Sequence, residues 1–148
     1  MQLFREVDRR ATAWRVIRFL DRPLDHYLAL SGKHRADLKS PIIDSQPKGS
    51  PTGNANEERM VNIWLATQVV ECTALAMQHS RQKCQDVLLG KYAVDEMRSG
   101  ELAEALHLSA TTFTERQQEA LNEFADRFEF WLVKRGLENE VPDLHVYQ

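Results

Sequence analysis

The chain has 148 residues, enough for one compact domain with a hydrophobic core, with or without appendages. Its hydrophobic content of 43% is ordinary, and its net charge of -3 is not that of a protein that coats nucleic acid through overall positive charge. Residues 1–50 hold ten Lys and Arg against six Asp and Glu, whereas residues 80–135 hold eight against ten. Positive charge is therefore concentrated at the N-terminal end.

Residues 1–39 are predicted to form an N-terminal helical arm. Asp8 is an N-cap residue type, and apolar residues at a 3/4 spacing predict a helix from about Asp8 to Leu20. Pro23 at a first turn and Gly32 as a stop predict a second helix. Basic side chains on this arm are either a solvated face or phosphate contacts. The candidates for phosphate contacts are Arg9, Arg10, Lys33 and Arg35.

Residues 40–56 are predicted to be a flexible linker, because Pro, Gly, Ser and Asn crowd into this window. Ile42 and Ile43 are expected to attach one end of the linker to the core. Asn56 is then the expected N-cap of a helix that runs to about His79. This helix is apolar on more than one side, so it is either central to the domain or packs against a partner chain.

The third predicted unit is a helical core over residues 57–136, followed by a C-terminal tail over residues 137–148. Within the core, Ser80 is the expected cap of a helix that ends near Tyr92, and residues 99–126 form a helix-turn-helix. The last helix should start after Ser109, an N-cap type, and end before Gly136. The predicted fold class is therefore all-α.

A helix-turn-helix presents its second helix to the major groove of DNA, and the residues of its first turns reach bases and phosphates. If Phe113 faces inward, the outward residues are polar or small, and Thr, Gln and Glu side chains can all pair with base edges. Ser109 and Arg116 would then hold a phosphate or the helix start. The predicted DNA-binding residues are Ser109, Ala110, Thr111, Thr114, Glu115, Arg116 and Gln118.

Patterns that would indicate an enzyme are weak. No two of the five histidines stand at the i, i+4 spacing of a helical metal site, and no Gly-rich phosphate loop is present. Cys72 and Cys84 lack the spacing of a zinc site and are predicted to be reduced core residues. The sequence therefore predicts no catalytic residues, no metal and no cofactor.

Several segments, taken in order, resemble the ArpU/RinA-like family of phage late transcriptional regulators. Its N-terminal part is similar to Glu6–Thr12 with Phe19, Leu20 and Tyr27, and its linker to Ser50–Glu58. Its C-terminal part is similar to Val87–Leu89 with Lys91 and Tyr92, then Glu101–Phe113 and Ala120–Ala125. That part in turn resembles region four of sigma factors. His107 stands in the turn where a glycine is usual, so this turn must accept a side chain at or near positive φ.

The resemblance implies sequence-specific binding of phage or prophage promoter DNA to activate late packaging or lysis genes, with bacterial RNA polymerase as a further partner. We expect a cytoplasmic protein of the bacterial host, without a signal peptide or an apolar run of membrane-spanning length. A homodimer assisted by Trp64, Phe128 and Trp131 is a further hypothesis. Two alternatives stay open: a phage DNA-packaging component like a small terminase subunit, and a module that binds RNA polymerase without touching DNA.

Overall fold

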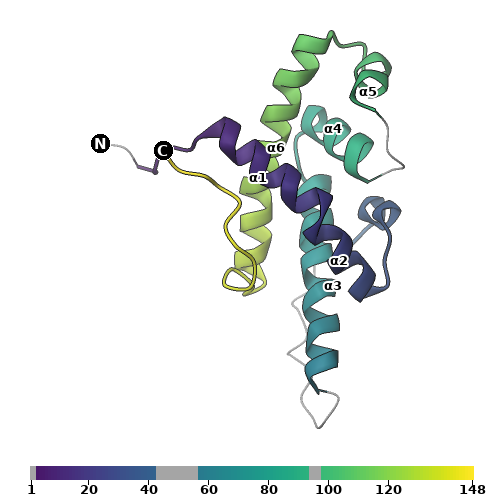
Figure 1. Ribbon diagram of the computed structural model, residues 1–148, viewed down its shortest axis with the longest axis vertical. Helices are drawn as coiled ribbons and strands as arrows, with labels where there is room; N and C mark the ends of the chain where they lie inside the picture. The colour runs from purple at the N-terminus through teal and green to yellow at the C-terminus, as the bar shows by residue number, and fades with distance from the viewer. Residues whose placement is uncertain (1–2, 43–56, 94–97) are drawn as a thin grey trace.

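The computed structural model describes residues 3–42, 57–93 and 98–148, and over these residues the chain is all-α, as predicted (Figure 1). A single antiparallel bridge, between Val7 and Tyr147, joins the two ends of the described chain. The elements are α1 (Arg9–Asp21), α2 (Pro23–Ser31), the 3-10 helix η1 (Arg35–Lys39), α3 (Glu57–Gln78), α4 (Gln82–Tyr92), α5 (Ser99–Ala105) and α6 (Ala110–Lys134).

Local sequence signals fix the first two helices. The Asp8 carboxylate accepts a hydrogen bond from the backbone N–H of Ala11 at 3.0 Å, which satisfies a donor that a helix start leaves open. Pro23 occupies the first turn of α2, and Gly32 ends this helix with φ at 70°. Trp14, although apolar, points away from the core and is exposed.

The long helices α3 and α6 form the centre of the fold, and α1 crosses α6 (Figure 1). Apolar side chains from every helix join in one core, to which η1 contributes Leu38. By length and a mean hydropathy of 1.3, α3 could cross a membrane, which corrects the expectation that no apolar segment has this length. Since 56% of the apolar 18-residue stretch within α3 is buried, α3 has the burial of a core helix.

The helices α1 and α2, which belong to the predicted N-terminal arm, pack into the core of the molecule. Val16, Leu20 and Leu24 are completely buried, and α1 and α2 pack against α6 and α3 within the same core. The tail is also part of this core, because Leu137, Val141 and Leu144 are buried. An apolar stripe predicts that a helix buries one face, but it does not say how far away in the sequence its partner lies.

The expected start of α4 needs a correction. Ser80 is not its cap, because the Ser80 hydroxyl donates to the backbone oxygen of Ala76 in the preceding helix. The cap comes instead from α6, where the Glu123 carboxylate accepts a hydrogen bond from the backbone N–H of Arg81 at 2.6 Å. A side chain distant in sequence thus satisfies a helix-start donor and ties α4 to α6.

The predicted linker is described only at its first three residues. Ile42 packs against the core, as expected for the attached end, and the Gln78 side chain donates to the backbone oxygen of Ser40 at 2.9 Å. The rest of the linker, with Ile43 and the predicted cap Asn56, lies outside the described residues, as do residues 94–97.

Candidate nucleic-acid interface

A four-residue turn, residues 106–109, joins α5 to the start of α6. His107 has φ at 59°, so the expectation of positive φ at this position is confirmed. The backbone N–H of Leu108 donates to the backbone oxygen of Ala103 at 2.8 Å, which closes the end of α5. Ser109 then caps α6, because its hydroxyl accepts from the N–H of Thr112 at 3.2 Å.

Tight packing holds this unit against α4. Leu102, Ala103 and Phe113 are buried, as predicted for the inward face of the two helices. A Cβ atom added at Gly90 of α4 would lie only 2.8 Å from Leu102 Cδ1, so the absence of a side chain at Gly90 lets α5 approach closely. The orientation of α5 and of the turn is therefore set by side-chain packing and not by the turn alone.

The first turns of α6 project beyond the core at one end of the molecule (Figure 1). Four of the residues predicted to face outward are exposed, namely Ala110, Thr111, Thr114 and Glu115, and the cap residue Ser109 is exposed as well. Arg116 and Gln118 are half-buried. The Thr114 hydroxyl donates to the backbone oxygen of Ala110 at 3.0 Å, which leaves its oxygen free to accept from a ligand.

Ion pairs attach the third and fourth turns of α6 to the start of α4. Arg81 pairs with Glu119 at 2.8 Å and also with Glu123, and Lys83 pairs with Glu119 at 3.1 Å. Burial opposes ionisation of Glu123, but hydrogen bonds from the side chain and backbone of Arg81 outweigh burial and lower its pKa. These contacts, together with Phe113, fix the direction in which the start of α6 points.

The predicted phosphate contacts lie in different surroundings. Arg9 and Arg10 are exposed at the start of α1. The Asn122 side chain donates to the backbone oxygen of Arg9 at 2.8 Å, which places this end of α1 beside α6. At a rise of 1.5 Å per residue, Asn122 lies roughly 18 Å along α6 from Ala110. The start of α1 therefore lies beside the middle of α6, about three turns along that helix from its exposed start.

Arg35 is not a free phosphate contact, which corrects the sequence interpretation. Its guanidinium donates to the backbone oxygens of Leu20 at 2.6 Å and Tyr92 at 3.1 Å, and it pairs with Asp25 at 2.8 Å. It therefore joins the ends of α1 and α4 to η1. Lys33, half-buried, lines a hollow together with Asp37 and Glu71, so its neighbours are acidic.

A polar cluster that the sequence did not reveal lies between α6 and the tail. One ligand atom each from Glu129, Asp143 and His145 lie within 4.8 Å of one another, a spacing that a metal ion could use. However, hydrogen bonds to Asp126 at 2.8 Å and Asp143 at 2.6 Å raise the pKa of His145 to about 9. Both ring nitrogens then carry protons, so the cluster is an imidazolium ion among carboxylates.

Two of the three residues proposed to assist a homodimer are buried in the core. Phe128 is 1% exposed and packs 5.1 Å from the Phe19 ring, and Trp131 is also buried, so neither can reach a partner chain. Trp64 is half-buried against the core. Cys72 and Cys84 are buried, as predicted for core residues.

Comparison with known proteins adds no identification. No family model, no curated protein and no solved structure matches this chain.

Proposed function

We propose that this protein binds promoter DNA in a sequence-specific way and activates transcription of late phage or prophage genes, as its resemblance to the ArpU/RinA-like family implies. The single observation that carries the proposal is the exposed N-terminal edge of α6. A helix start with donor and acceptor side chains, held rigidly by a second helix, fits the major groove.

The contacts divide into two groups. Thr111, Thr114, Glu115 and Gln118 would read base edges, and the backbone N–H groups at the capped start of α6 would approach a phosphate. Since α5 and the start of α6 carry Glu101, Glu104 and Glu115, most of the positive charge must come from elsewhere. Arg9 and Arg10 would supply it on one flank, with Arg116 beside the helix start.

Selection of bound sequences from random duplex DNA tests the proposal. We expect enrichment of one short motif, and a footprint at discrete bases of the enriched duplex. Recovery of unrelated sequences, with no footprint at modest salt, would favour the polymerase-binding module. A large ring in solution, seen by light scattering, would favour a packaging component.

A further inference from the structure

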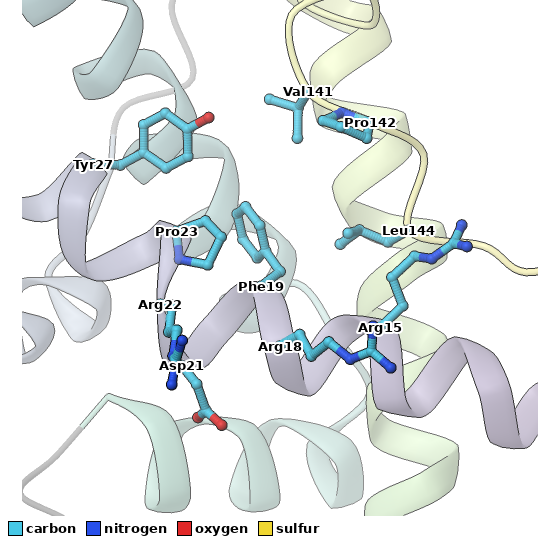
Figure 2. Close-up of a pocket in the computed structure, with 10 residues that line it drawn as sticks. All are labelled: Arg15, Arg18, Phe19, Asp21, Arg22, Pro23, Tyr27, Val141, Pro142 and Leu144. Atoms are coloured by element: carbon cyan, nitrogen blue, oxygen red, sulfur yellow. The ribbon is translucent and has the colours of Figure 1, made fainter.

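A cavity of about 700 Å³ lies between α1, α2 and the C-terminal tail. Figure 2 shows the side chains of Phe19, Pro23 and Tyr27 on one side, and those of Val141, Pro142 and Leu144 on the other. Its volume is typical of pockets for small molecules, which measure roughly 300–1,000 Å³. None of its lining residues belongs to α5 or α6, so it is separate from the candidate nucleic-acid interface.

Both apolar walls are held in place without a ligand. Phe19 is buried, and its ring packs 5.1 Å from that of Phe128. On the opposite wall, Val141 and Leu144 are buried. The Arg15 guanidinium fixes this wall to α1 by donating to the backbone oxygens of Asp143 at 3.2 Å and His145 at 2.8 Å. A ligand would therefore enter a preformed space, which lowers the entropy cost of binding.

Positive charge lies on one side of this cavity only. Arg15 and Arg18, three residues apart, share one face of α1, and Arg22 directly follows this helix. Arg18 and Arg22 are exposed, and the lining contains a single carboxylate, that of Asp21. Figure 2 shows Arg15 and Arg18 along α1 below the apolar side chains. Three cations against one anion favour a negatively charged ligand.

We propose that this cavity binds a small organic anion with an aromatic or branched aliphatic body. The body would pack between Phe19 and Leu144, and its carboxylate, sulfonate or phosphate would meet Arg18 and Arg22. A neutral ligand would leave Arg18 and Arg22 without an anionic partner, and an inorganic anion would leave the apolar walls in contact with water. A site of this kind can exist whether or not the protein binds DNA.

The probe 8-anilinonaphthalene-1-sulfonate has this chemistry, and N-phenyl-1-naphthylamine has the same rings without the sulfonate. We expect saturable fluorescence with one sulfonate probe per chain, and binding of the neutral probe about fivefold weaker. The double variant Arg18→Ala and Arg22→Ala should weaken sulfonate binding by about fivefold or more, as for loss of partly exposed ion pairs. It should leave the affinity for the neutral probe unchanged.

The matched control is Arg9→Ala with Arg10→Ala, which removes the same charge from α1 outside the cavity and should leave sulfonate binding unchanged. Amide chemical shifts should change around Phe19, Tyr27 and Leu144 when the probe binds. Equal losses in both double variants, or shifts confined to exposed Met60, Ile63, Phe130 and Val133, would overturn the proposal. An acidic, leucine-rich peptide that shifts the amides of Phe19, Tyr27 and Leu144, with no binding of the sulfonate probe, would also overturn the proposal. The cavity would then be a site for a protein segment.

Discussion

The two ends of α6 differ in how deeply they are buried. At its start, Thr111 and Thr114 are exposed and polar, and contact with the rest of the chain comes mainly through Phe113. At its other end, Phe128 and Leu132 are buried beneath α1, α3 and the tail. One helix of 25 residues thus anchors itself in the core by one end and presents the other to solvent.

This contrast separates stability from binding. Substitutions at buried positions of α6 should change the free energy of unfolding, whereas substitutions at the exposed positions of its first turns should leave it nearly unchanged. If the start of α6 binds DNA, substitutions at its exposed positions should lower the affinity for DNA without unfolding the protein.

The largest expected effect is at the buried end. Phe128→Ala should lower the free energy of unfolding by about 3–5 kcal/mol, because it removes a ring that packs on Phe19 and Phe124 and leaves a cavity. Urea unfolding measures the change. Phe130→Ala is the matched control, since Phe130 is 56% exposed and should cost less than about 1 kcal/mol. Similar losses in the two variants would contradict the assignment of the core.

The junction between the two halves is Glu123. Glu123→Gln should cost about 1–2 kcal/mol, because it weakens the cap on the Arg81 N–H and removes an ion pair. Since the folded-state pKa of Glu123 is lowered, its contribution is present above the unfolded pKa and is lost as pH falls. Urea unfolding at pH 7 and pH 3 measures both effects. Glu115→Gln, at an exposed position, is the control, and an equal loss there would contradict the capping role.

The tail provides a pH test of the buried end. The folded pKa of His145 is raised from 6.5 to about 9, so its contribution is complete below pH 6.5 and disappears as pH rises through about 9. The Tm of the wild type should therefore fall between pH 6 and pH 9.5. His145→Gln should lose less over the same interval, and parallel curves for the two proteins would show that the cluster contributes nothing.

The smallest effect is expected in the turn before α6. Because His107 has φ at 59°, His107→Gly should raise the free energy of unfolding by about 0.5 kcal/mol. The gain is small, since glycine also increases the entropy of the unfolded chain. His107→Ala keeps a Cβ atom and should give no gain. A loss of stability in the glycine variant would mean that the His107 side chain makes a contact that outweighs its strained backbone.

Features that depend on residues close together in the chain could be predicted from the sequence. The caps at Asp8 and Ser109, the stops at Gly32 and Gly136 and the inward face of α6 all follow from spacing and residue type, and all are confirmed. The exposure of Thr111 and Thr114 follows from the same spacing, because it was derived from the inward position of Phe113.

The sequence did not predict contacts between residues far apart in the chain. Arg35 could not be distinguished from a free cation, because its partners Leu20 and Tyr92 belong to other helices. The same holds for the cap that Glu123 places on α4, 42 residues away, and for the docking of the tail by Arg15. Composition reports that a charge is present but not whether another element uses it.

The central claim is that the exposed end of α6 reads bases. The most direct measurement is the affinity of Thr114→Ala with Gln118→Ala for the selected duplex and for a scrambled duplex, by fluorescence anisotropy at fixed salt. We predict a loss of about tenfold or more on the selected duplex and less than about twofold on the scrambled one. The control Asn62→Ala, at an exposed position of α3, should bind both as the wild type does. Equal losses on the two duplexes, or no loss on either, would contradict the account.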